Sequence, residues 1–135
     1  MVKGNIIHPQ ILAAVAACGH GDKVLIADGN YPLASKTGTA EKVYLGLKPG
    51  CPTVPDVLAA LQTIINIEKA EVMDPGDGIT PDIFEVFQTM LADTPMSKHN
   101  RNEFYEECEK AAVRLAISTG ERRVFANILI TVGVA

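Results

Sequence analysis

The sequence predicts an α/β fold in which helices cover a mostly parallel or mixed central sheet. Short apolar runs alternate along the chain with stretches of helical periodicity, which is the pattern of this fold class. The apolar run at residues 24–27 is continuous and rich in β-branched residues, as expected of a strand buried on both faces. With 135 residues, the chain has the length of one domain, residues 1–135, that can bury a core.

The elements in the first half of the chain are delimited by prolines and glycines. Pro9 is suited to the first turn of a helix, in which apolar residues recur at helical spacing until Gly19 ends it. The strand at residues 24–27 follows. A second strand is expected over residues 42–47 and, after a Pro- and Gly-rich break, an amphipathic helix over residues 53–65.

The second half begins with a short strand at residues 70–73 and a loop. Thr80 and Pro81 predict a helix start, with the Thr80 hydroxyl as N-cap and Pro81 at the first helical position. The side chains of this helix that we expect to face the core are Ile83, Phe84, Val86, Phe87, Met90 and Leu91.

The last two elements are a long helix and a strand. Asn100 and Glu103 have the spacing of a capping box, which predicts a helix over residues 101–119 that ends at Gly120. The apolar segment at residues 126–132 is expected to form the final strand.

The composition excludes several classes of partner. The formal net charge is −4 and no run of Lys or Arg is present, which argues against a nucleic-acid partner because such proteins carry clustered basic residues. Aromatic residues make up 5% of the chain and Trp is absent, so a base-stacking surface is not expected. The apolar stretches are too short to span a bilayer, and we expect no membrane partner.

The cysteines and the N-terminus predict a cytoplasmic protein. Cys18, Cys51 and Cys108 are odd in number and widely spaced, so neither a disulfide framework nor a zinc ribbon is expected, and we interpret them as free, buried or half-buried thiols. Residues 1–5 lack the long apolar region of a signal peptide. A reducing cytoplasm is therefore the expected location.

Two ionisable side chains flank the first predicted strand. His20 lies between Gly19 and Gly21 just before it, and Asp28 follows it directly. Histidine exchanges protons near neutral pH, and ligands of α/β proteins bind at strand ends. Asp28 is interpreted either as a turn residue or as an acceptor of hydrogen bonds from sugar-like hydroxyls. Asp22 either supports His20 by orienting its imidazole or caps a turn.

Three further polar residues could join such a site. Arg101 and Tyr105 lie one helical turn apart and share a face, so that they either contact one ligand or are an exposed Arg and a half-buried Tyr. Asn127 offers a donor and an acceptor, or simply begins the last strand. The sequence has no glycine-rich nucleotide motif and no histidine spacing typical of a metal site. Acid–base chemistry with no cofactor and no metal is the remaining hypothesis.

Taken together, several motifs resemble the fucose mutarotase and ribose pyranase family over nearly the whole chain. The motifs are Gly-His-Gly-Asp at residues 19–22, Asp28 with Pro32, Asn-Arg-x-x-Phe-Tyr-Glu at residues 100–106, Thr-Gly-Glu at residues 119–121, and the closing segment at residues 125–134. The resemblance implies interconversion of the anomers or ring forms of free monosaccharides without a cofactor. It also implies a three-layer α/β/α sandwich and a homo-oligomer, with pentameric rings that can stack into decamers and a site near a subunit boundary.

The resemblance also assigns roles to individual residues. It implies that His20 is the proton donor, and that Asp28, Arg101 and the segment Phe125, Ala126 and Asn127 bind the sugar. We expect Tyr105 to assist.

The residues do not all point to the same branch of the family. Gly21 and the pattern at residues 100–106 resemble the L-fucose mutarotase branch, which tends to have His where Asn30 stands. Phe125 replaces the usual family tyrosine, and a missing hydroxyl can change which sugar fits. We expect an L-fucose mutarotase-like isomerase. A D-ribose pyranase and a non-catalytic monosaccharide-binding accessory protein of sugar uptake stay open as alternatives.

Overall fold

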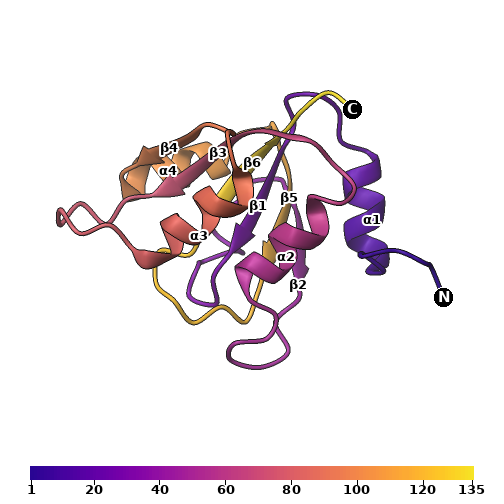
Figure 1. Ribbon diagram of the computed structural model, residues 1–135, viewed down its shortest axis with the longest axis horizontal. Coiled ribbons are helices and arrows are strands. Elements are labelled where there is room, and N and C mark those ends of the chain that lie inside the picture. The colour runs from indigo at the N-terminus through magenta and orange to yellow at the C-terminus, as the bar shows by residue number, and fades with distance from the viewer.

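The computed structural model describes residues 1–135, which form a six-stranded sheet with helices on both of its faces (Figure 1). Along the chain the elements are α1 (Pro9–Ala16), β1 (Lys23–Ala27), β2 (Glu41–Tyr44), α2 (Val54–Leu61), β3 (Ile67–Met73), α3 (Asp82–Leu91), β4 (Met96–His99), α4 (Arg101–Cys108), β5 (Val113–Ser118) and β6 (Ile128–Val132).

The sheet is mixed and mostly parallel, as predicted. Its strand order is β2-β5-β1-β6-β3-β4. The pairs β2–β5, β1–β5 and β3–β4 are parallel, whereas β6 runs antiparallel to both β1 and β3. The C-terminal ends of five strands therefore lie at the same end of the sheet, where β6 begins. The segments that follow β1, β3 and β4 lie together at this end.

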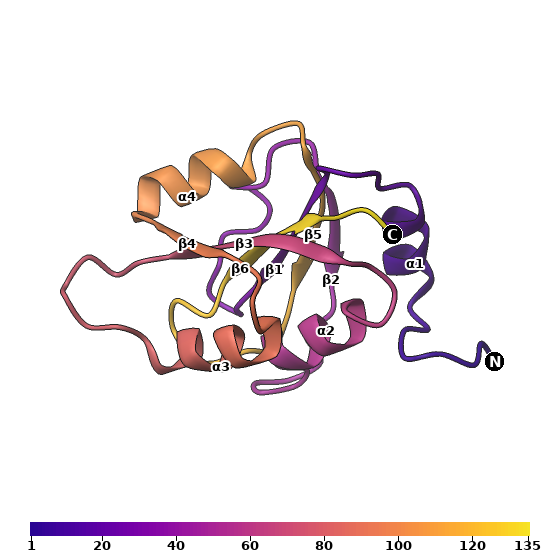
Figure 2. The ribbon, with the colours of Figure 1, turned by 45° about the horizontal axis from the view of Figure 1, so that its top comes forward.

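Two layers of helices enclose the sheet. Helices α1, α2 and α3 pack on the apolar side chains of one face, whereas α4 and the segment before β2 cover the other face (Figure 2). Strand β1 shows why both layers form: Val24 and Ile26 belong to the first core, while Leu25 and Ala27 belong to the second. All four are inaccessible to solvent. The three-layer α/β/α sandwich and the doubly buried strand at residues 24–27 are thus confirmed.

The predicted helix over residues 101–119 is wrong in its second half. Helix α4 ends at Cys108, and residues 113–118 form strand β5 between β1 and β2. The side chains of Leu115, Ala116 and Ile117 are all fully buried. Consecutive residues point to different sides of a helix, so one buried helix face could not cover all three, whereas a central strand buries both of its faces.

Strand β4 (Met96–His99) was not predicted either. It is a short edge strand in which Ser97, Lys98 and His99 are polar, so it lacks the apolar run by which the other strands are recognised. Its pairing with β3 is parallel and joins segments that are distant in sequence, which no local pattern predicts.

Several boundaries differ from the predicted ones. Helix α2 and strand β2 are shorter than expected, β3 starts earlier at Ile67, and β6 starts later at Ile128. Pro81 is the N-cap of α3 and no side chain caps this helix, so the prediction of Thr80 as the cap is wrong. Val86 is 37% exposed and does not face the core, contrary to the prediction.

The N-terminus of α4 and the cysteines agree with the sequence-based predictions. Asn100 caps α4, with its side chain accepting a hydrogen bond from the Glu103 amide. The three thiols are free, Cys108 being buried and the other two half-buried. None of the helices has both the length and the apolar character that crossing a membrane requires.

Candidate functional site

A pocket of about 170 Å³ lies where β1 and β3 end and α4 begins. It is lined by five of the predicted site residues, namely Asp28, Arg101, Tyr105, Phe125 and Asn127. They come from three separate parts of the chain, which lie together at one end of the sheet. The other lining residues, which sequence reasoning did not assign to the site, are Asn30, Tyr31, Pro32, Met73 and Val124.

Asp28 and Asn127 form a reciprocal pair at the base of this pocket. The Asp28 amide donates to Asn127 Oδ1 at 2.8 Å, and Asn127 Nδ2 donates to Asp28 Oδ2 at 3.2 Å. The Asn30 amide donates to Asp28 Oδ1 at 2.9 Å, so the carboxylate also stabilises the turn after β1. Both side chains are buried, Asp28 being 3% exposed. The pair fixes one carboxylate and one amide on the pocket.

Burial dominates the electrostatics of Asp28. Loss of hydration raises the pKa of this carboxyl, and the hydrogen bonds it accepts from backbone amides and from Asn127 oppose that rise only in part. The carboxyl group therefore holds a proton more readily than an exposed Asp does. When it is ionised, it can accept hydrogen bonds from the hydroxyls of a ligand in the pocket.

Phe125 and Arg101 form another wall of the pocket. Phe125 has a φ of 58°, in the left-handed region that bulky residues rarely adopt. Its half-buried ring packs on the core beneath α4, and the Arg101 guanidinium carbon lies 5.7 Å from the ring centroid. Arg101 is the first residue of α4. The position of the first turn of α4 therefore determines where the positive charge of Arg101 lies.

Tyr105 reaches the pocket from the next turn of α4. Its ring lies edge-to-face with Tyr31 at a centroid distance of 5.6 Å, and Lys36 Nζ lies 5.6 Å from the Tyr105 centroid. The Tyr31 hydroxyl donates to the Lys36 carbonyl at 3.0 Å, and burial raises the pKa of Tyr31. Ala126 is fully buried and does not line the pocket.

His20 lies away from this pocket in the same chain. It precedes β1, whereas Asp28 follows β1, so the strand separates them. The His20 side chain is 59% exposed, and its Nε2 is 2.8 Å from Glu68 Oε2. It lines a separate groove of about 750 Å³ between α1, residues 62–66 and the C-terminal residues 132–135. A single chain therefore does not bring His20 together with the other candidates.

Asp22 caps a turn, which is the second of the two interpretations above. Its Oδ2 accepts a hydrogen bond from the Gly19 amide at 2.8 Å. The carboxylate in contact with the imidazole is that of Glu68, which the sequence analysis did not identify. Glu68 is 48 residues away on β3, and nothing in its local sequence indicates this contact.

The Thr-Gly-Glu motif links the end of β5 to β1 and to the start of α2. Thr119 Oγ1 donates to the Ala27 carbonyl at 2.8 Å, which ties the end of β5 to the end of β1. A Cβ on Gly120 would lie 2.3 Å from the Lys48 carbonyl oxygen, so only glycine fits there. Glu121 accepts hydrogen bonds from the Val54 amide at the start of α2 and from the Arg123 guanidinium.

Comparison with known proteins gives a consistent result. Residues 1–135 match the sequence model of the RbsD / FucU transport protein family. A fucose mutarotase of Mus musculus is 30% identical over 145 residues, which cover 96% of this chain and 90% of that protein. A D-ribose pyranase of Geobacillus thermodenitrificans is 28% identical over 134 residues, covering 99% and 98%.

Two ligand-bound structures share the fold. Bacillus subtilis RbsD complexed with D-ribose superposes with a TM-score of 0.88 at 25% identity, over 100% of this chain and 99% of that one. The fucose mutarotase of Streptococcus pneumoniae in complex with L-fucose superposes with a TM-score of 0.81 at 25% identity, over 96% and 94%.

Proposed function

The chain belongs to the RbsD / FucU transport protein family, and from this premise we propose that it is a cofactor-free mutarotase of free monosaccharides, with L-fucose or a related aldose as substrate. The observation that carries the proposal is the pocket at residues 28, 101, 105, 125 and 127. It combines a carboxylate, an amide and a guanidinium with aromatic rings. A sugar presents hydroxyls at its edge and C–H groups on its faces, and this combination can bind both.

We propose that the complete site forms between two copies of the chain. His20 and the pocket lie at opposite ends of β1, which supports a site where His20 comes from a neighbouring copy. His20 and the C-terminal residues line one groove, so the same surface would bring both to that neighbour. A homo-oligomer, with pentameric rings that can pair as a decamer, satisfies this requirement, because a ring repeats one head-to-tail interface.

In the proposed mechanism His20 moves protons at the sugar ring. His20 donates a proton to the ring oxygen, the bond between C1 and that oxygen breaks, and the anomeric hydroxyl gives up its proton to a water molecule, which leaves an open aldehyde. Rotation about the C1–C2 bond and the reverse steps close the ring on the other face. Acid–base assistance of this kind is worth about 10²–10⁴-fold. Because sugars already mutarotate in water, no covalent intermediate is needed.

The other residues hold the sugar in this mechanism. Asp28 and Asn127 accept from and donate to its hydroxyls, Arg101 donates to a further oxygen, and Tyr105 assists. Glu68, which contacts His20 Nε2, orients the imidazole. The three free thiols support a location in the reducing cytoplasm, where such thiols persist.

Exchange NMR tests this proposal directly. Saturation-transfer spectra of L-fucose, D-ribose, D-galactose and D-glucose are recorded with catalytic amounts of the protein and of H20Q. Faster exchange between the α and β signals of one sugar, lost in H20Q, supports the mutarotase. H8Q is a matched control, because His8 caps α1 and lies outside the proposed machinery. Sugar binding without faster exchange would instead identify an accessory binding protein.

A D-ribose pyranase is the second candidate. Phe125 lacks the hydroxyl of the family tyrosine, and the chain superposes well on the ribose-bound RbsD. The same spectra distinguish the two enzymes, because a pyranase accelerates exchange between the pyranose and furanose signals of D-ribose. Anomer exchange in L-fucose that is faster than ring-size exchange in ribose would exclude this second candidate.

A further inference from the structure

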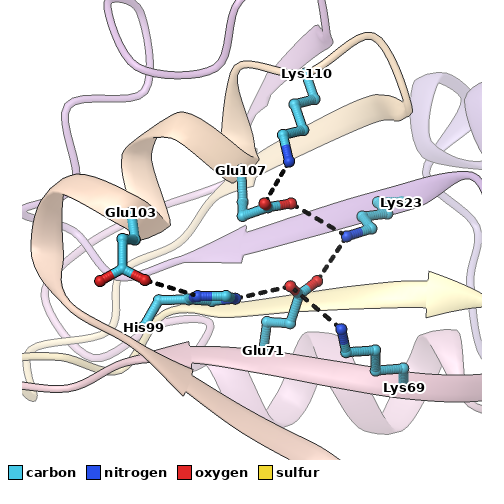
Figure 3. Close-up of polar contacts among 7 residues, drawn as sticks. All are labelled: Lys23, Lys69, Glu71, His99, Glu103, Glu107 and Lys110. Atoms are coloured by element: carbon cyan, nitrogen blue, oxygen red, sulfur yellow. Dashed lines mark hydrogen bonds and ion pairs between the residues drawn. The ribbon is translucent and has the colours of Figure 1, made fainter.

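An ionic network lies beneath α4, next to the pocket but outside it (Figure 3). At its centre is Glu71 of β3, which is only 2% exposed. Lys23 Nζ of β1 lies 2.7 Å from Glu71 Oε2, and His99 Nε2 of β4 lies 2.8 Å from Glu71 Oε1. Each oxygen of this buried carboxylate therefore has a short contact from a different strand.

Further charged groups surround this centre, as Figure 3 shows. Lys69 Nζ lies 3.6 Å from Glu71 Oε1, and the Glu107 carboxylate of α4 lies 3.5 Å from Lys23 Nζ. Lys110 pairs with Glu107 at the exposed margin. Glu103 Oε2 of α4 lies 3.7 Å from His99 Nδ1. His99 thus stands between a carboxylate on the sheet and one on the helix.

The buried carboxylate depends on these contacts. Burial opposes ionisation of Glu71, but the hydrogen bonds from Lys23 and His99 outweigh it and hold the pKa of Glu71 below its usual value. If the ionised Glu71 carboxylate loses the hydrogen bond from His99, one of its buried oxygens loses its closest donor, which is unfavourable. The contact between Glu71 and His99 is therefore a strong restraint on the position of His99.

His99 lies directly before the N-cap of α4. Its carbonyl accepts a hydrogen bond from the Asp74 amide at 2.7 Å, and the next residue, Asn100, is the N-cap of the helix. Arg101 follows directly, and Tyr105 lies one turn later. Both line the pocket, whereas neither His99 nor Glu71 does.

We propose that His99 and Glu71 are positioning residues for the sugar pocket, in which the His99–Glu71 contact fixes the start of α4 and thereby holds the Arg101 guanidinium over Phe125. This inference rests on the proposed function. It makes sugar affinity depend on a histidine that does not touch the sugar. Since the restraint acts through Arg101, it affects binding of the sugar and not the proton transfer at His20.

A matched pair of substitutions tests the contact. H99Q keeps a side-chain amide that can donate to Glu71, whereas H99M has similar size and no donor. We expect H99M to raise the KM of the converted sugar about tenfold with kcat within about twofold, because coupling through such contacts typically changes affinity by about 2- to 30-fold. H99Q is expected to stay within about threefold of the wild type. K110Q, at the exposed margin, is the control and is expected to leave KM unchanged.

A double-mutant cycle separates positioning from a general structural role. If His99 acts through Arg101, H99M has little further effect on KM in an R101A background, whereas a general loss of structure would add to the R101A effect. Thermal unfolding confirms that each variant is folded, and E71Q replaces H99M in the cycle if H99M does not fold. Equal effects of the substitution in both backgrounds, or an H99Q protein as impaired as H99M, would overturn the inference.

Failure of the proposed function gives a different result. If the wild type binds a sugar without accelerating its exchange, the Kd of that sugar replaces KM in the double-mutant cycle. Additive effects of H99M and R101A on this Kd would then overturn the positioning role of His99. If the wild type neither binds nor converts any sugar, the proposed function fails and the inference fails with it.

Discussion

Replacing Asn127 by Ala should destabilise the protein markedly, because two hydrogen bonds depend on this one side chain. Its Nδ2 donates to the Asp28 carboxylate, and its Oδ1 accepts from the Asp28 amide. A hydrogen bond to a charged group contributes about 1.5–3 kcal/mol, and a buried amide left without a partner costs about 1–3 kcal/mol. Water can enter from the pocket, so we expect the lower part of the summed range, a loss of about 3 kcal/mol in the free energy of unfolding.

Urea unfolding followed by circular dichroism measures this loss, with N66A as the matched control. Asn66 is exposed and makes one side-chain hydrogen bond, to the Val134 carbonyl at 2.8 Å, so its replacement should cost less than about 1 kcal/mol. If N127A loses no more stability than N66A does, the Asp28–Asn127 pair does not stabilise the base of the pocket. Wild-type exchange rates in a folded N127A protein would show that the pair has no part in sugar binding.

Two further predictions concern the Thr-Gly-Glu motif at residues 119–121. The hydrogen bonds from Arg123, with smaller contributions from the backbone amides, lower the pKa of Glu121 from 4.5 to about 2. As the pH falls, Glu121 of the unfolded chain is protonated before Glu121 of the folded protein. The stability that the Glu121–Arg123 pair supplies above about pH 4.5 is therefore lost as the pH falls toward 2. Unfolding of wild type and E121Q between pH 6 and pH 2.5 checks this, and parallel pH profiles would contradict it. G120A should lose about 3 kcal/mol, the upper end of the usual cost of overpacking, or fail to accumulate as folded protein, because its Cβ would overlap the backbone carbonyl of Lys48. Thermal melting measures this loss against G19A, where a Cβ meets no atom within 4 Å. Equal melting temperatures would refute the overlap.

The parts of the fold that follow local rules were predictable. Strand β1 was found because four apolar residues in a row require burial on both faces, and the start of α4 was found because Asn100 and Glu103 have capping spacing. Strand β5 was missed because a continuous helix also accounts for apolar residues after a capping signal. The difference depends on β1 and β2 lying on either side of β5, which is not a local property.

The candidate site was predictable to a similar extent. Asp28, Arg101 and Asn127 each stand at an element boundary, where the sheet brings them together. Glu68 and Glu71 were missed, because their contacts with His20 and His99 join segments that are distant in sequence. The sequence analysis grouped His20 with Asp28 in one site, although a strand places the residues before and after it at opposite ends.

A subunit-mixing experiment tests most directly whether His20 and the pocket form one active site. H20Q and D28N are each purified as inactive proteins, then unfolded together and refolded as a mixture, and exchange in the converted sugar is measured by saturation-transfer NMR. If His20 of one copy serves the pocket of another, about a quarter of the sites in an equal mixture contain both native residues, and about a quarter of the wild-type rate should return. A mixture as inactive as its two components, beside wild-type protein that is active after the same refolding, would contradict the shared site.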